Sequence, residues 1–230
     1  RYARIAGALY VVIFVAAPFS IVYVRATLIT PGGAAATADA VLGQEWLLRL
    51  GTVGELVLVL CDVVLSIVFY VLLRRVSQAL ALLAASLRLM HSAITGVNLV
   101  TNLIALNVLD GDAADRDALA LLFLESHDYF FATGLVFFGL HLLVLGYLML
   151  RTVAFPRVLG VLLAVASVCY LANSFAALMA LDYGGTGQAL VLLPAAVAEL
   201  ALCGWLIRGR RAPVPAPAQT PAQTPAQTPA

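Results

Sequence analysis

Residues 79–106 read ALALLAASLRLMHSAITGVNLVTNLIAL and are long enough to cross a bilayer, because about 20 apolar residues in a helix suffice. Polar residues interrupt this segment at steps of three or four: Arg88, His91, Thr95, Asn98 and Asn102. That spacing places them on one face of a helix. Because a polar stripe must face protein or water rather than lipid, the segment predicts a helix inside a membrane bundle.

The composition of the whole chain is typical of a membrane protein. Of its 230 residues, 63% are hydrophobic and 11% are charged, and the mean hydropathy is +1.02. Soluble domains have about 45–50% apolar and about 25% charged residues. The 13 basic residues are all arginine and the formal net charge is +1, so the chain lacks the basic surface on which nucleic-acid binding depends. Composition therefore excludes an ordinary soluble domain, a disordered chain and a nucleic-acid-binding protein.

Several further apolar segments reach membrane-spanning length. The complete set is 4–24, 54–73, 79–106, 129–150, 156–181 and 188–207. An earlier start of the fourth segment is compatible with the apolar residues 118–126. We therefore expect an all-α, polytopic membrane helix bundle with six transmembrane helices within residues 1–211. Residues 212–230 repeat Pro-Ala-Gln-Thr without an apolar face, which predicts a disordered tail.

The arginines predict the orientation of this bundle. With six spans, most of them fall on one side: Arg1, Arg4, Arg74, Arg75, Arg151, Arg157, Arg208, Arg210 and Arg211. The opposite side holds Arg25, Arg49 and Arg116 together with most of the acidic loop residues. By the positive-inside rule, we expect both termini in the cytoplasm.

The longest loop on the outer side, residues 25–53, allows two interpretations. Residues 38–50 carry apolar side chains on one helical side, including Trp46, and polar ones largely on the other. This pattern is typical of a short helix that lies on the outer leaflet with Trp46 at headgroup level. It is equally consistent with a helical extension of the second span.

Ionisable residues inside the spans form a layer near the middle of the membrane. Counted from the inner arginines at 1.5 Å per residue, five of them lie about 13–18 Å deep. These are Asp62, Arg88, His91, His141 and Glu199. Because charged groups are costly in hydrocarbon, each is a candidate functional residue. We expect them to form a polar cluster that binds a ligand or protons.

A second set of polar residues lies farther out in the same spans. Its members are Glu55, Asn98, Asn102, His127, Asp128, Tyr170 and Asn173. They predict a polar path from the outer surface to the cluster. Structural roles remain open for many of these residues: Arg88 and Asp62 as a buried ion pair, the histidines and asparagines as interhelical hydrogen-bonding partners, and Glu199 as a cap for backbone freed near Pro194.

No enzyme or cofactor motif is recognisable. The chain has no Walker A loop, GxGxxG, GxSxG or HExxH sequence, and its cysteines all lie in apolar runs. Arg88 stands one turn from His91, which argues against a divalent cation there. No metal site and no cofactor are therefore predicted, although His91 and His141 at similar depth leave a bis-histidine haem as an alternative.

The order of several short motifs resembles a known family. These motifs include Arg4-Ile5-Ala6-Gly7 with Tyr10, Leu28-Ile29-Thr30-Pro31-Gly32, Phe137-Phe138-Gly139-Leu140-His141 and Pro156-Arg157-Val158-Leu159-Gly160. Over about residues 3–182 the chain resembles the bacterial membrane family called domain of unknown function 4386. That family usually has Asp where Asn173 stands, and the sixth span resembles it weakly. The resemblance implies a multi-pass protein of the bacterial plasma (inner) membrane and implies no particular activity.

Three classes of function remain open. The first and favoured one is a non-enzymatic binding, sensing or transport protein, in which Arg88 holds an anionic group or the cluster relays protons. The second is a membrane enzyme or a b-type haem or metal protein that uses His91 and His141. The third is a structural membrane scaffold. The expected partners are the lipid bilayer and a small molecule or proton, with no nucleic acid and with the oligomeric state left open.

Overall fold

The computed structural model describes residues 2–181 and 184–208, so the expected tail at 212–230 lies outside the described residues. The described part contains helices and no strand. Its elements are α1 (Tyr2–Ala17), the π-helix η1 (Pro18–Tyr23), α2 (Val24–Leu28), α3 (Ala34–Gly43), α4 (Glu45–Leu73), α5 (Gln78–Leu109), α6 (Arg116–Leu150), α7 (Arg157–Leu178) and α8 (Gly184–Arg208).

The expected all-α architecture with six spans is confirmed. In the described residues, six helical segments are long and apolar enough to cross a membrane, the first being the continuous run Tyr2–Leu28 formed by α1, η1 and α2. Helix α6 begins at Arg116, so the apolar residues 118–126 belong to the same helix as 129–150, in agreement with the earlier start that the sequence left open.

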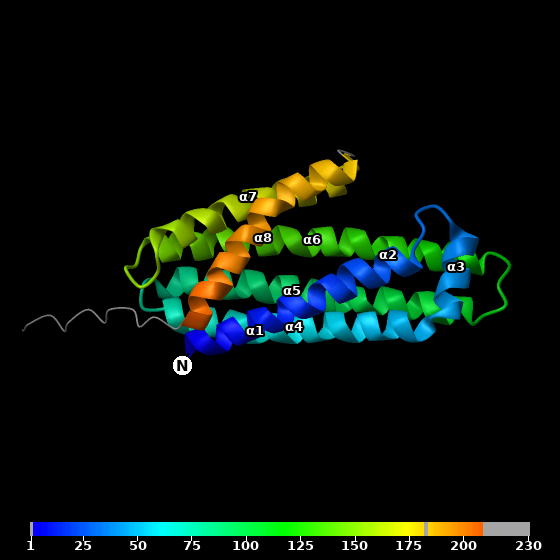
Figure 1. The fold of residues 1–230 in the computed structure, drawn as a ribbon, viewed down its shortest axis with the longest axis horizontal. Helices are drawn as coiled ribbons and strands as arrows, with labels where there is room; N and C mark the ends of the chain where they lie inside the picture. Colours follow the sequence, from blue (N-terminus) through cyan, green and yellow to red (C-terminus); the bar gives the residue numbers. More distant parts are fainter. Residues whose placement is uncertain (1, 182–183, 209–230) are drawn as a thin grey trace, which may run out of the picture.

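The spans form a closed ring around a shared interior. Each packs against the next in the order α1, α4, α5, α6, α7, α8, and α8 packs against α1 again. The start of α1 and the end of α8 lie at the same end of the bundle (Figure 1). There Gly7 meets Ile207 so closely that a Cβ on Gly7 would lie 2.8 Å from the Ile207 backbone nitrogen. This close contact joins the first and last spans and completes the ring.

The first span changes its helical geometry halfway along. Pro18 begins the π-helical turn η1, where its missing N–H removes one helical hydrogen bond. Buried Ser20, in the same turn, faces Gly54 of α4, a position without a side chain that allows this close approach. Through this turn, η1 packs against α4.

Residues 38–50 do not form one helix. The chain breaks at Gln44, and α3 ends before the break while Glu45 begins α4. Trp46 therefore belongs to an extension of the second span, as one of the two interpretations held, and its side chain is exposed. Helix α3 packs across the outer ends of α2, α4, α5 and α6, burying Ala38 and Val41. The separate helix is thus a cap on the bundle and not an extension of it.

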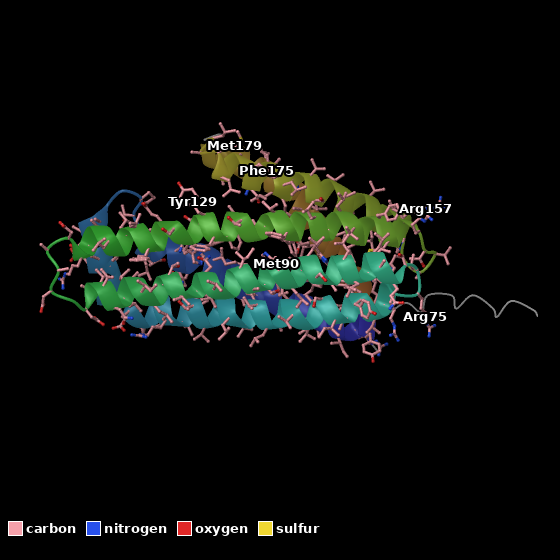
Figure 2. All side chains as sticks on the ribbon, turned by 180° about the vertical axis from the view of Figure 1, so that it is seen from behind. Arg75, Met90, Tyr129, Arg157, Phe175 and Met179 are labelled. Carbon is pink, nitrogen blue, oxygen red and sulfur yellow. The ribbon has the colours of Figure 1, made fainter. Side chains whose placement is uncertain are left out.

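The surface around the ring is apolar. Figure 2 shows Met90, Tyr129 and Phe175 on this surface, and about half of each side chain is exposed. Arg75 and Arg157 lie at the same end of the bundle (Figure 2). An apolar belt with charges at its end is the arrangement that a bilayer requires, and it leaves the polar residues of the spans to face inward.

Candidate functional site

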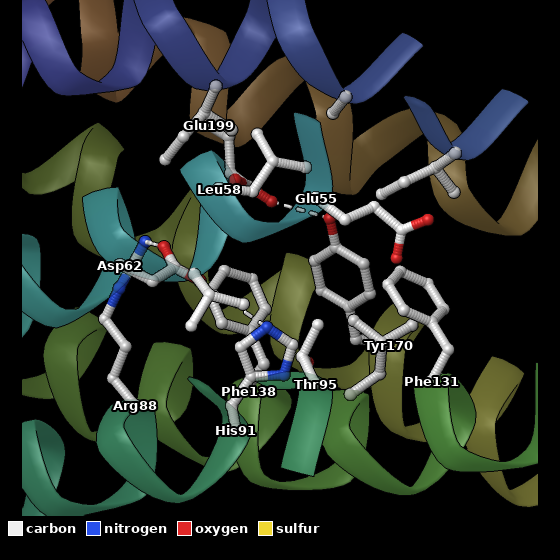
Figure 3. A pocket seen from close by; sticks show the side chains of 15 residues that line it. Glu55, Leu58, Asp62, Arg88, His91, Thr95, Phe131, Phe138, Tyr170 and Glu199 are labelled. Carbon is white, nitrogen blue, oxygen red and sulfur yellow. Dashed lines mark hydrogen bonds and ion pairs between the residues drawn. The ribbon is translucent and has the colours of Figure 1, made fainter. Parts of the chain in front are cut away.

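A cavity of about 140 Å³ lies inside the ring and is lined by side chains from all six spans (Figure 3). Three carboxyl groups contribute to its wall: Glu55 and Asp62 from α4, and Glu199 from α8. Arg88 and His91 of α5 line the same space. Four of the five residues predicted to form the mid-membrane cluster therefore share one cavity, together with Glu55 from the outer set.

Arg88 is held entirely by groups of the protein. Its side chain is 1% exposed, and Nη2 donates to Asp62 Oδ1 in a buried ion pair. Nη1 lies 3.2 Å from His141 Nε2 and donates to Tyr10 Oη at 3.4 Å. The guanidinium carbon is 5.1 Å from the centre of the Phe138 ring, which is within cation–π range. Both Nη atoms are thus engaged within the chain, and the buried Nε has no hydrogen-bond partner among the described residues.

His141 is the one predicted cluster residue that does not line the cavity. Its Nδ1 lies 2.8 Å from the Ala84 carbonyl oxygen and its Nε2 contacts Arg88, so both ring nitrogens are engaged. The Phe138 ring lies near both histidines, with its centre 5.0 Å from that of His91 and 5.8 Å from that of His141. Among the described residues, no three His, Cys, Asp or Glu side chains are grouped to hold a metal ion.

Asp62 connects Arg88 to His91. Its second carboxylate oxygen, Oδ2, lies 3.5 Å from His91 Nε2, and its side chain keeps 13% exposure. Gly134 of α6 stands against the other side of the imidazole, where a Cβ would lie 3.1 Å from His91 Nδ1. His91 is thus fixed between α4 and α6 with Asp62 at the cavity wall.

Glu199 is joined to α7 by a hydrogen bond from Tyr170. Tyr170 Oη donates to Glu199 Oε1 at 2.6 Å, and both residues line the cavity (Figure 3). Glu199 is 8% exposed. In the part of the chain that the structure describes, no basic side chain lies within 4.0 Å of its carboxylate. Of the three acidic groups in the wall, this is the one without a basic side chain beside it in the described residues.

Glu55 connects the cavity to the outer polar residues. Its Oε2 lies 2.9 Å from His127 Nε2, and His127 Nδ1 is 3.8 Å from Asp128 Oδ1. The Asp128 side chain is 70% exposed and accepts a 2.8 Å hydrogen bond from Arg25. Asn98 Nδ2 donates to the backbone oxygen of His127 at 3.0 Å. A row of acid and base groups therefore runs from the surface to the cavity.

The remaining members of the predicted outer path lie elsewhere. Asn102 Nδ2 donates to Thr52 Oγ1 at 3.2 Å and so joins α5 to α4. Asn173 is buried on α7 and is not among the side chains that line the cavity. These two residues are therefore separate from the row that ends at Glu55.

Several residues of the site were not predicted from the sequence. Tyr10 and Phe138 surround Arg88, but both are aromatic residues in apolar spans, and no sequence signal distinguishes them from ordinary packing residues. Thr95 was recognised in the polar stripe but not as a site residue, and it lines the cavity. Arg25, which binds Asp128, lies near the predicted end of the first span and was read only as a loop residue.

Comparisons with known proteins place this arrangement in a family. The chain is 29% identical over 122 residues to a curated protein of Archaeoglobus fulgidus named "Uncharacterized protein", an alignment that covers 52% of this chain. The chain spans 62% of the length of that relative, which is less than two thirds. No solved structure matches the chain.

A family model described as "Domain of unknown function (DUF4386)" matches residues 5–209. The match continues past residue 182 and includes the sixth span, for which the sequence resemblance is weak. It therefore covers the whole ring of helices and every side chain of the cavity wall. By this match the chain belongs to the family Domain of unknown function (DUF4386).

Proposed function

We propose that this protein is a non-enzymatic membrane protein that binds a small ligand in the cavity inside its ring of helices, for sensing or transport. The observation that carries the proposal is the cavity itself, which is lined by side chains from all six spans and has the carboxyl-bearing residues Glu55, Asp62 and Glu199 in its wall. Pockets that bind small molecules are mostly apolar with a few convergent polar groups, which is the composition of this wall.

The cavity distinguishes this proposal from a purely structural scaffold. A scaffold needs its polar groups to pair with one another, as Arg88 does with Asp62, His141 and Tyr10. Such pairing explains why these four side chains lie together inside the bundle. It does not explain why Glu55, Asp62 and Glu199 border an open space that apolar side chains could have filled.

The acid and base groups above the cavity support an access route for protons or solute. Asp128 is exposed, His127 is buried, and Glu55 lines the cavity, so that neighbouring side chains connect the surface with the interior. We further propose that the chain resides in a bacterial inner membrane with both termini in the cytoplasm. The arginines at the shared end of α1 and α8 support this orientation.

Cysteine accessibility tests the proposal. In a background without Cys61, Cys169 and Cys203, Thr95→Cys places a thiol in the cavity wall. Ser92→Cys is the matched control, because Ser92 lies one turn away on the same helix, is 2% exposed and does not line the cavity. Both variants are treated in detergent with 2-aminoethyl methanethiosulfonate, a small water-soluble thiol reagent.

We expect Thr95→Cys to be modified in the folded protein and Ser92→Cys only after unfolding. A ligand-binding cavity must exchange its contents with the solution, whereas a sealed structural cavity need not. If the two thiols are equally protected in folded protein, the cavity is closed and the proposed function is wrong.

A further inference from the structure

We propose that the ligand is a small protonated amine with an apolar body, whose ammonium group lies beside the carboxyl group of Glu199. The inference rests on the proposed function, because it names the chemical class of the ligand for the same cavity. It depends on the charge, the unused acceptors, the rings and the size of the cavity.

The charges in the wall do not balance within the chain. Arg88 pairs with Asp62, and His127 stands beside Glu55. Glu199 has only the hydroxyl of Tyr170, with no basic side chain within 4.0 Å in the described part of the chain. An unpaired charge in a buried site is expensive, so the excess negative charge requires either protons or a cation from outside.

The unused polar atoms of the wall suit a donor. An ammonium group has three N–H donors and no acceptor. Only Tyr170 among the described residues donates to the Glu199 carboxylate, which leaves further lone pairs there. The wall thus offers an unused acceptor to such a guest.

Aromatic rings complete the surroundings of a cation. Phe131, Phe138 and Tyr170 line the cavity (Figure 3). The faces of such rings attract cations, and Phe138 already carries the Arg88 guanidinium at 5.1 Å. The rest of the wall is aliphatic, including Ile13 and Leu135. The aliphatic part favours an apolar body attached to the charged group.

The size of the cavity and the charges in its wall restrict the class of ligand further. A cavity of about 140 Å³ is close to the engineered cavity of about 150 Å³ that binds benzene. An anion would face three carboxyl groups, while the one guanidinium in the wall is occupied by Asp62. Benzylamine, which joins a benzene ring to an ammonium group at neutral pH, is therefore a fitting probe.

The test compares three probes of nearly the same shape on the purified full chain in detergent at pH 7. Benzylamine is cationic, benzyl alcohol is neutral and benzoate is anionic, and saturable binding is followed by titration calorimetry. We expect benzylamine to bind at least tenfold more tightly than benzyl alcohol and benzoate not to bind. Glu199→Gln should weaken benzylamine at least tenfold and leave benzyl alcohol unchanged. Asp112→Asn removes an exposed acid from the loop between α5 and α6 and should change neither affinity.

Each result decides the inference, and the probes on the wild-type chain decide it even if Glu199→Gln fails to fold. Equal affinities for benzylamine and benzyl alcohol, or preferential binding of benzoate, would overturn the amine and leave a binding cavity in place. Failure of all three probes while Thr95→Cys is accessible would also overturn the amine. Protection of Thr95→Cys, in contrast, removes the proposed function itself.

Discussion

Glu55 Oε2 and His127 Nε2 lie 2.9 Å apart, with the two side chains only 3% and 1% exposed between α4 and α6. The residues are far apart in sequence, and each belongs to a different span. A buried pair of this kind fixes the register of two helices, because each partner left alone would be an unsatisfied polar group. In this protein the pair also lies between the exposed Asp128, which His127 contacts, and the cavity, which Glu55 lines.

Replacing Glu55 by leucine should lower the stability of the folded chain. The variant leaves His127 Nε2 without its partner, a loss of about 1–3 kcal/mol for a buried group. Thermal unfolding in detergent measures the effect. The control is Glu45→Leu on the same helix, which removes only the half-exposed ion pair with Arg49, worth about 0–1 kcal/mol. Similar losses of stability in the two variants would show that the buried pair stabilises the protein no more than the half-exposed one.

Arg88→Leu should be strongly destabilising, and adding Asp62→Leu should restore much of the loss. Removing one partner of a buried ion pair typically costs about 3–5 kcal/mol, since the other charge is left uncompensated. The double variant removes both charges, which apolar side chains can replace. Chemical denaturation in detergent measures both proteins. A double variant no more stable than Arg88→Leu would mean that Arg88 acts mainly through Tyr10 and His141.

The sequence predicted the spans well because bilayer length and hydropathy are properties of one segment at a time. It also predicted one common level for Asp62, Arg88, His91 and Glu199, since rise along a helix is regular, and these four residues line one cavity. The level of His141 along α6 was equally predictable, but the direction in which its side chain points was not. The His141 side chain contacts Arg88 and does not line the cavity. This direction depends on how α6 is rotated against α5, and that rotation depends on packing between the helices.

Glu55 illustrates a second limit of sequence reasoning. Its position two turns from Asp62 assigned it to an outer layer, about 10 Å away along the helix. The structure brings both to one cavity because the space extends along α4 and η1 lines its outer part through Ile21. The π-helical turn at Pro18 is a departure from regular geometry that hydropathy does not report.

Gly160→Ala should destabilise the contact between α6 and α7, while Gly204→Ala should not destabilise α8. A Cβ on Gly160 would lie 2.9 Å from the Gly146 carbonyl oxygen and 2.7 Å from Leu150 Cγ, so the helices must separate. No atom lies within 4 Å of a Cβ on Gly204, where alanine would favour the helix by roughly 0.5–1 kcal/mol. Thermal unfolding should move in opposite directions for the two variants. A rise in melting temperature for both would show that α6 and α7 can adjust freely.

The arginines predict that the shared end of α1 and α8 faces the cytoplasm. Arg74, Arg75, Arg151 and Arg157 lie in the two loops at this end, whereas the opposite loop after α5 carries Asp110 and Asp112. Basic residues are retained on the cytoplasmic side during insertion. Two fusions in a bacterial host test this: a reporter active only in the cytoplasm, placed after the C-terminus or within the loop between α5 and α6. We expect activity from the first fusion and none from the second. Activity only from the loop fusion would invert the topology, and the route through Asp128 and His127 would then open toward the cytoplasm.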